Sequence, residues 1–529
     1  MNTLPRWGPS HQHSPQAEFR RRLTNALTIV AFVAALLWQG VFIAIIVLAV
    51  VVTIFRVGRS LNTRLAPTVS SAGARLATSP APLAAVLEHS RQLGGGAYLG
   101  ADGDGGWVCA RREHAVLLLG PPRSGKTSAV IDPAMLAHAG PAVSASTKPD
   151  VLGATAGVRA TLGRVWEFDP TGERATLGAQ AQLRWSPVTS SRTWDGALLM
   201  ARAMVTGSHV GTGTTDASHW AKRASALLAP LLHAAVLSAQ DIGAVASWVL
   251  AHDLDTPAVV LERSRAQLPA STLAGLRNTE ARERSSIFSA AADALDAYSS
   301  TGALTAARDP NFDPPAFVSS TDTIYIHAPA EHQALAAPLV CGLLSEIRAA
   351  TYRAHREGAL RDRVVFALDE AANIAPLSDL PQIASEGGGQ GLQLIACFQD
   401  LSQARARWGQ AADGFLTLFG TKLILPGIAD QRTLESISTA LGEYDRQMVS
   451  TTRTRPSNSL LGSPNPHAHP QQSRTISTQR QRVLSPGEIA GIPAGRGLHL
   501  DGVAWQFLTL TPAFQAEPWR TLTASQSAR

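Results

Sequence analysis

The segment GPPRSGKTS, residues 120–128, most narrowly limits what this chain can fold into. It fits the pattern G-x-x-x-x-G-K-[ST]. In this pattern the glycines let backbone N–H groups surround the phosphates, the lysine places a positive charge at the β- and γ-phosphates, and the Ser or Thr hydroxyl binds Mg²⁺. The apolar run AVLLLG (115–120) before it is typical of a buried parallel strand, and a helical run follows. A chance glycine-rich turn is the alternative, but this context predicts a site for ATP and Mg²⁺. The predicted nucleotide-binding residues are Gly120, Pro121, Arg123, Ser124, Gly125, Lys126, Thr127 and Ser128.

An acidic pair follows a second apolar strand, in VVFALDEAANI (364–374). Asp369 is predicted to hold Mg²⁺ through water, together with Thr127, and Glu370 to orient or deprotonate the attacking water. An acidic pair at this point can also be a plain helix N-cap. Its combination with Lys126 favours the catalytic interpretation.

A glutamine ends the third apolar run, LQLIACF (392–398). Gln399 is predicted to hydrogen-bond the γ-phosphate or the water and to report hydrolysis to the rest of the domain; a solvated amide at a strand end is the alternative. The predicted catalytic residues are therefore Lys126, Glu370 and Gln399.

Strand and helix patterns alternate along most of the chain, which predicts an α/β fold with a mostly parallel sheet and helices on both faces. Between about Trp194 and Arg308 the strand pattern disappears and helical patterns remain, so an all-helical insertion is predicted there. Further apolar strands follow it, beginning with DTIYIH (322–327).

A long stretch near the N-terminus, residues 23–55, contains no charged residue. One helix of this length would be about 50 Å long, against a hydrocarbon core of about 30 Å. A single tilted span and a hairpin of two spans (23–37 and 41–55) are both possible; a secretory signal would be shorter, and a soluble helix pair would show polar faces. Arginines flank both ends, and the preference of cytoplasmic flanks for basic residues favours the hairpin. We therefore expect a multi-pass protein of the cytoplasmic membrane with most of the chain in the cytoplasm.

Residues 450–482 are rich in Ser, Thr, Pro, Asn and Gln, with five arginines and no acid. This composition predicts a mobile loop, with contact to DNA as one possible role and a solvated linker as the other. The net charge of +6 is mild for a chain of 529 residues and does not by itself indicate nucleic-acid binding. The three cysteines lie far apart, which predicts neither a disulfide framework nor a zinc site.

Several motifs occur together in one order: GPPRSGKTSAVIDPAML, STKPD, EFDP, RWSPV, HWAKRASALLAPLLHAAV, the run from ALDEAANIAPL to FQDLSQARARWG, and SPGEIAGIPAGRGLHLDG. Over about residues 110–515 they resemble the coupling proteins of type IV secretion and conjugation, the TraG/TraD type, especially the form in high-GC Gram-positive bacteria. The resemblance implies a RecA-like P-loop ATPase domain, an inserted all-helical domain, an N-terminal transmembrane helix pair and a hexameric ring. It implies an ATPase that passes DNA to a secretion channel, with relaxase or relaxosome proteins, channel components and the membrane as partners. The DNA is expected to be single-stranded and bound without sequence preference.

Rival functions with the same site chemistry are an FtsK-like DNA translocase, a protein-secretion ATPase and a weakly hydrolysing nucleotide-gated receptor. The sequence also departs from many members of the family it resembles, which carry an arginine where Gly388 stands. If that arginine reaches the nucleotide of a neighbouring subunit, this chain must use another, and Arg405 and Arg407 are the candidates. The predicted divisions are 1–60, tail and anchor; 61–190, first part of the nucleotide-binding domain; 191–310, helical domain; 311–515, second part, with the loop 450–482; and 516–529, tail.

Overall fold

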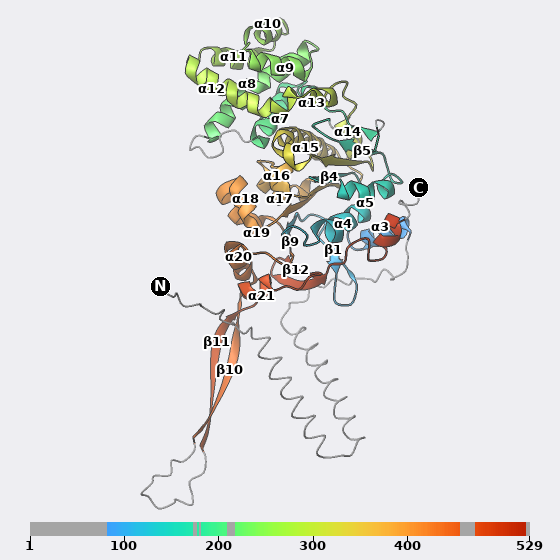
Figure 1. Ribbon diagram of the computed structural model, residues 1–529, viewed down its shortest axis with the longest axis vertical. Helices are drawn as coiled ribbons and strands as arrows, with labels where there is room; N and C mark the ends of the chain where they lie inside the picture. Colours follow the sequence, from blue (N-terminus) through green and yellow to red (C-terminus); the bar gives the residue numbers. More distant parts are fainter. Residues whose placement is uncertain (1–81, 173–176, 179–180, 209–216, 455–470, 525–529) are drawn as a thin grey trace, which may run out of the picture. The chain divides into compact units, whose positions relative to one another are not determined.

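An eleven-stranded sheet organises the described part of the chain, in the order β2-β1-β13-β12-β9-β3-β8-β7-β4-β6-β5 (Figure 1). The computed structural model describes residues 82–172, 177–178, 181–208, 217–454 and 471–524. The parallel strands are β9 (Thr421–Ile424), β3 (Val116–Leu119), β8 (Leu392–Phe398), β7 (Val364–Leu368), β4 (Ala142–Ser146), β6 (Thr323–His327) and β5 (Val165–Phe168). The antiparallel edge consists of β12 (Arg496–Asp501), β13 (Ala504–Thr509), β1 (Tyr98–Ala101) and β2 (Trp107–Cys109). This sheet confirms the predicted α/β class.

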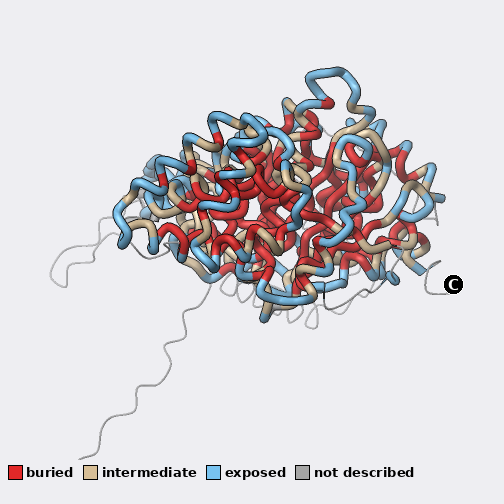
Figure 2. The backbone as a smooth tube through the Cα atoms, turned by 90° about the horizontal axis from the view of Figure 1, so that it is seen from above, coloured by how far each residue is buried: buried red, intermediate tan, exposed pale blue. Residues whose placement is uncertain are grey.

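The central strands are buried on both faces. In β3, Leu117 and Leu119 pack into the core on one face, and Val116 and Leu118 into the core on the other. The second core contains side chains of α4 (Asp132–Ala137) and α5 (Asp150–Arg159). A strand covered on both faces needs apolar residues at every position, which is why these strands appear in the sequence as unbroken apolar runs. Figure 2 shows the buried residues gathered in the interior.

Most of the described residues between β5 and β6 lie in helices. The larger ones group beyond the end of the sheet in Figure 1. They are α7 (Trp194–Gly207), α8 (Ala217–Leu237), α9 (Ile242–Leu250), α10 (Asp255–Arg263), α11 (Gln267–Arg277) and α12 (Ala281–Leu295), with shorter α6 (Pro187–Ser190), α13 (Thr301–Ala306) and α14 (Pro314–Val318). Side-chain caps start several of them, as at Thr193 before α7 and Asp241 before α9.

One helix of the described residues, α15 (Gln333–Arg356), is long and apolar enough to cross a membrane. Most of its apolar stretch is buried within the protein, where Gly342 lies against Trp185 and Met200 and Cys341 lies against Gly207 of α7. This is the environment of a core helix. The predicted membrane segment 23–55 lies outside the described residues.

Two C-terminal segments differ from the sequence predictions. The predicted mobile loop 450–482 is wrong for the residues that the structure describes, because β10 (Glu443–Thr454) and β11 (Gln471–Arg482) form a separate antiparallel hairpin. The residues assigned to a tail contain α22 (Trp519–Ala524), whose Trp519 is buried against Tyr98 and Trp107. The remaining C-terminal helices are α16 (Ala371–Ile374), α17 (Leu380–Glu386), α18 (Leu401–Trp408), α19 (Phe415–Leu418), α20 (Gln431–Leu441) and α21 (Pro486–Ala490).

Candidate nucleotide-binding site

Sheet topology brings the three sequence-predicted segments to one edge. Strand β8 lies between β3 and β7, and all three are parallel. The residues that follow them directly are Gly120, Asp369 and Gln399, and the N–H of Gly120 donates to the carbonyl of Phe398 at 3.0 Å. The carboxyl edge of a parallel sheet is where open α/β folds bind their ligands.

The loop after β3 is tightly folded. A Cβ on Gly120 would lie 2.6 Å from the Ser124 hydroxyl, so no side chain fits there. Arg123 and Gly125 have φ angles of 65° and 95°, in the left-handed region that glycine adopts without strain and other residues seldom occupy. The chain then enters a π-helix, Lys126–Ile131, a rare form that is common at functional sites.

Lys126 is turned into this loop, and its side chain is nearly buried. Its ammonium donates to the carbonyls of Gly120 and Pro121, the latter at 3.0 Å. The charge is therefore already placed inside the loop, where phosphate oxygens can replace the two carbonyls as acceptors. Of the other predicted ligands, the Arg123 side chain is exposed, and the Ser128 carbonyl accepts a hydrogen bond from the N–H of Ala513.

Thr127 and Asp369 are in direct contact, although 242 positions separate them in the chain. The Thr127 hydroxyl donates to the Asp369 carboxylate at 2.7 Å. A hydroxyl and a carboxylate placed side by side suit Mg²⁺, which takes oxygen ligands and is commonly held by one or two protein groups plus substrate phosphates. Burial raises the pKa of Asp369, while the Thr127 hydrogen bond and the Lys126 charge lower it. In the described residues no group of three or more His, Cys, Asp or Glu side chains is arranged to hold a metal ion.

Glu370 has a strained backbone, with φ 66° and ψ 51°. This left-handed conformation costs a non-glycine residue about 1–2 kcal/mol, and such strain is found preferentially at functional sites. Glu370 precedes α16, but its side chain caps no N–H of that helix; it accepts from the Asn373 amide at 3.4 Å. Glu370 therefore does not make the side-chain hydrogen bond by which an N-cap is defined. Its carboxylate is partly exposed at the sheet edge.

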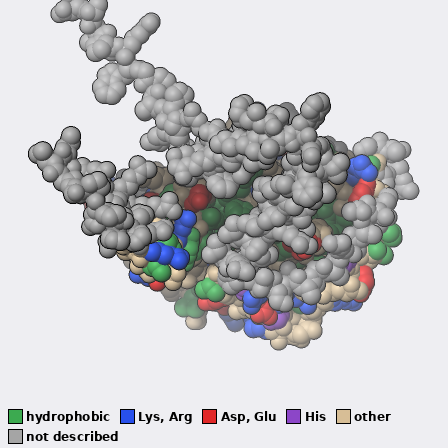
Figure 3. Space-filling view, turned by 90° about the horizontal axis from the view of Figure 1, so that it is seen from below, with side chains coloured by type: hydrophobic (Ala, Val, Ile, Leu, Met, Phe, Trp, Pro, Cys, Tyr) green, Lys and Arg blue, Asp and Glu red, His purple; other side chains and the backbone are tan. Residues whose placement is uncertain are grey.

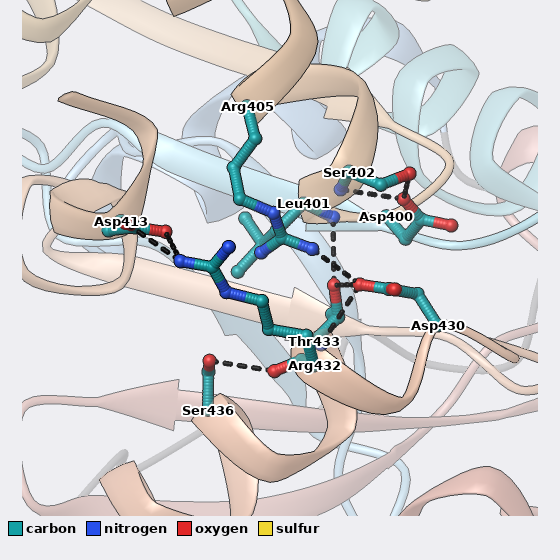
Figure 4. A network of polar contacts seen from close by, with 9 residues as sticks. All are labelled: Asp400, Leu401, Ser402, Arg405, Asp413, Asp430, Arg432, Thr433 and Ser436. Carbon is teal, nitrogen blue, oxygen red and sulfur yellow. Dashed lines mark hydrogen bonds and ion pairs between the residues drawn. The ribbon is translucent and has the colours of Figure 1, made fainter. Parts of the chain in front are cut away.

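Gln399 is half-buried, and its N–H donates to the Gln403 side chain of α18 at 2.9 Å. The next residues form the network of Figure 4: the N–H of Leu401 donates to the Thr433 hydroxyl, and Thr433 and Arg405 both donate to the Asp430 carboxylate. The segment after β8 is thus fixed to the start of α20.

Both arginines proposed for a neighbouring site are engaged within their own chain. Arg405 pairs with Asp430 at 2.6 Å, and Arg407 donates to backbone carbonyls of residues 206–208, at the end of α7 and just beyond it. Gly388 leaves no room for a side chain, because its Cβ would lie 1.8 Å from the Glu113 carbonyl oxygen. An arginine at 388 would therefore require the backbone to move.

Asp132 is a site residue that the sequence analysis missed. It is 5% exposed, one of its carboxylate oxygens has no hydrogen-bond partner among the described atoms, and its N–H donates to the Thr127 carbonyl. Burial, followed by the negative charges of Asp369 and Asp150, raises the pKa of Asp132 to about 8. The signal in the sequence is a lone carboxylate within the apolar run AVIDPAML (129–136).

Replacing Asp132 with asparagine is expected to stabilise the nucleotide-free protein increasingly as pH rises from about 4 to about 8. In that range the folded wild type holds a proton that the unfolded chain releases, so wild-type stability falls with rising pH; asparagine does not titrate. The gain at pH 8 is on the order of a few kcal/mol, since one pKa unit corresponds to about 1.4 kcal/mol. Thermal unfolding in EDTA measures it. The exposed Asp104→Asn is the matched control, and equal shifts for both variants at every pH would contradict the expectation.

Fold and site together are those of a P-loop α/β protein with a RecA-like sheet and a helical insertion. Residues 363–494 match the family model described as the TraM recognition site of TraD and TraG. No curated protein sequence matches the chain.

Solved structures share the fold. The unbound bacterial conjugative coupling protein TrwBdeltaN70 is 18% identical, with a TM-score of 0.58 over 78% of this chain and 88% of that chain. The plasmid coupling protein TrwB with the non-hydrolysable ATP analogue ADPNP is 18% identical, with a TM-score of 0.56 over 76% and 86%. TrwB with ADP and Mg²⁺ is 17% identical, with a TM-score of 0.55 over 76% and 85%. Residues 363–494 are thus similar to the TraM recognition site of TraD and TraG, and the chain has the fold of the conjugative coupling protein TrwB.

Proposed function

We propose that this chain is a membrane-anchored ATPase that couples a DNA substrate and its relaxosome to a type IV secretion channel and drives transfer by ATP hydrolysis. The observation that carries the ATPase assignment is the 2.7 Å contact between Thr127 and Asp369, which joins the phosphate loop to the acidic strand. The coupling role is supported by the TraG/TraD match over residues 363–494 and by the TrwB fold. TrwB has been crystallised with ADPNP and with ADP and Mg²⁺, ligands of the class proposed here.

Each site residue has a proposed task. Lys126 balances the charge of the β- and γ-phosphates within the loop from Gly120 to Ser128. Thr127 and Asp369 hold Mg²⁺, which neutralises phosphate charge when bound. Glu370 orients the attacking water and accepts its proton, and Gln399 hydrogen-bonds the γ-phosphate. Loss of the γ-phosphate removes the Gln399 contact and frees the segment that continues into the α18–α20 network.

We also propose the membrane location and the oligomeric state of this ATPase. Residues 23–55 anchor it as a helical pair in the cytoplasmic membrane, with the P-loop on the side that supplies ATP. The ring is a homo-hexamer that contacts relaxase and channel components. The divisions at 60, 190, 310 and 515 stay predictions; the helices from α7 to α13 agree with a helical domain near 191–310.

ATP turnover by the full chain in a neutral detergent, with and without DNA, tests the proposal. We expect Mg²⁺-dependent phosphate release that DNA accelerates. Turnover indifferent to DNA would favour a protein-secretion ATPase, and nucleotide binding without turnover would favour a nucleotide-gated receptor. Stimulation by any DNA without binding to relaxosome proteins would favour a chromosome-type translocase.

A further inference from the structure

The β10–β11 hairpin is an arm that no described part of the protein covers. Twelve residue pairs, from Glu443↔Arg482 to Thr454↔Gln471, form a ribbon about 40 Å long at 3.3 Å per residue. It extends away from the main sheet in Figure 1. Every residue of 445–452 and 473–481 is exposed. An isolated two-stranded ribbon buries little apolar surface and is only marginally stable, so the hairpin adds little to the stability of the fold and leaves both of its faces open to a partner.

The arm carries positive charge on both faces. From Arg446 to Arg482 the sequence contains no Asp or Glu. Arginines at the base are paired, Arg480 with Glu443 and Arg482 with Glu435. Farther out, Arg446 and Arg474 form no ion pair within the described part of the chain. Along the lower rim of the view in Figure 3, by contrast, basic and acidic side chains lie next to one another.

The register places these two outer arginines on opposite faces. Arg446 lies opposite Gln479, and Arg474 lies opposite Thr451, and successive positions of a strand alternate between faces. A helix or ribbon that lies on a lipid surface concentrates basic residues on one side and apolar residues on the other. Charge on both faces instead suits a ribbon that is surrounded by a polyanion or inserted into its groove.

Most side chains near these arginines are hydrogen-bond donors without charge; the exceptions are the acidic Asp445 and the exposed apolar Met448, Val449 and Ile476. Hydroxyl and amide side chains of this kind donate to phosphate oxygens, and such contacts position a protein on nucleic acid without reading sequence. The residues are Gln447, Ser450, Thr451, Thr452, Ser473, Thr475, Ser477, Thr478, Gln479 and Gln481. A two-stranded ribbon also has the width that the major groove of B-DNA admits.

We propose that residues 446–452 and 473–479 of the β10–β11 hairpin bind the phosphate backbone of nucleic acid without sequence preference. The inference rests on the proposed function, because it names where the DNA substrate is held. The base of the arm is fixed to the nucleotide-binding domain: Arg482 contacts Glu435 of α20, and the Ser438 hydroxyl donates to the Leu484 carbonyl at 2.6 Å. Since α20 begins in the network that holds the segment after Gln399, DNA on the arm is also expected to influence ATP turnover (Figure 4).

The test compares Arg446→Gln/Arg474→Gln with a matched control, Arg356→Gln/Arg361→Gln, which removes two exposed arginines elsewhere. The probe is a fluorescein-labelled oligonucleotide of mixed sequence, single-stranded and as a duplex, titrated with the full chain in a neutral detergent. Two lost phosphate contacts are expected to lower the slope of log K against log salt by about 1.4 for single strands and about 1.8 for duplex. Affinity near physiological salt falls about tenfold, while the control and the DNA-independent ATPase rate stay at wild-type values.

Two failures are distinguishable. If wild type binds DNA and hydrolyses ATP in response, yet Arg446→Gln/Arg474→Gln keeps its affinity and salt slope, the hairpin assignment is overturned and the proposed function stands. If wild type itself neither binds the oligonucleotide nor responds to it, both are overturned.

A shortened arm gives a second, independent measurement. Replacing Arg446–Gln479 with an Asn-Gly turn removes both outer arginines, keeps the residue pairs from Glu443↔Arg482 to Asp445↔Arg480 at the foot of the arm and is expected to weaken DNA binding at least as much. Trypsin cleavage at Arg446 and Arg474 is expected to be slowed by DNA. Protection by phosphatidylglycerol vesicles and not by DNA would assign the arm to a membrane surface. A changed sedimentation coefficient with unchanged DNA affinity would assign it to contacts between copies of the chain. Either result overturns the proposal.

Discussion

Replacing Lys126 with alanine is expected to abolish measurable ATP turnover and to weaken nucleotide binding about 100-fold. The ammonium lies in the loop between Gly120 and Thr127, nearly buried, with two carbonyls as acceptors in the absence of a ligand. A charge-assisted hydrogen bond to a phosphate is worth about 1.5–3 kcal/mol, and a charge that stabilises the transition state contributes more. Alanine removes both contributions and leaves the backbone cradle intact.

Titration with a fluorescent ATP analogue and a phosphate-release assay measure this expectation. Lys222→Ala, an exposed lysine of α8 that lies in the helical segment, is the matched control and should retain both activities. Circular dichroism establishes that Lys126→Ala is folded. Turnover at the wild-type rate in a folded Lys126→Ala protein would contradict the assignment of the phosphate loop.

The core of the site could be predicted because its strands are buried on both faces. Such strands leave unbroken apolar runs in the sequence, and the polar residue that ends each run marks the sheet edge. Asp369 and Gln399 end two such runs, whereas Gly120 is identified by the phosphate-loop motif, and the structure brings all three to neighbouring strands. The runs do not give the order of the strands. The two motifs predict that Thr127 and Asp369 serve one Mg²⁺ ion, and the fold adds the direct hydrogen bond between them.

The hairpin escaped prediction for the opposite reason. Both of its faces are exposed, so its strands carry Ser, Thr, Gln and Arg at nearly every position and show neither an apolar run nor an apolar alternation. That composition is also typical of disordered chain. The apolar residues present, Met448, Val449 and Ile476, are too few to set a period. Pairing over almost forty positions, from Glu443 to Arg482, leaves no local signal.

Two other features depend on packing that a sequence does not display. Trp519 in the assumed tail is 1% exposed because its ring stacks on Trp107, more than four hundred positions earlier. The position of Gly388 follows from the approach of the Glu113 carbonyl, which excludes any side chain. The backbone around position 388 therefore accepts only glycine, and the arginine found at this position in many members of the family would not fit.

Replacing Glu370 with glutamine is expected to reduce the rate of ATP hydrolysis about 1,000-fold while leaving nucleotide affinity within a few-fold of wild type. Glutamine keeps the size and the strained backbone of Glu370 but accepts no proton from water. Lys126, Thr127 and Asp369 hold the phosphates and Mg²⁺ unchanged. Single-turnover hydrolysis and equilibrium binding separate the two quantities, and the exposed Glu357→Gln is the control.

Glycine at the same position separates chemistry from strain. Glu370→Gly is expected to lose hydrolysis to the same extent but to raise the free energy of unfolding by about 1 kcal/mol, because glycine adopts a φ of 66° without the cost that a side chain incurs. If replacing Glu370 makes the protein more stable but inactive, the strained backbone at 370 serves to place the carboxylate at the site. If Glu370→Gln hydrolyses ATP at the wild-type rate, the base lies elsewhere and the strain at 370 serves the fold alone. If Glu370→Gln instead loses ATP affinity together with turnover, the carboxylate acts in binding, and the division of labour between Glu370 and Lys126 is wrong.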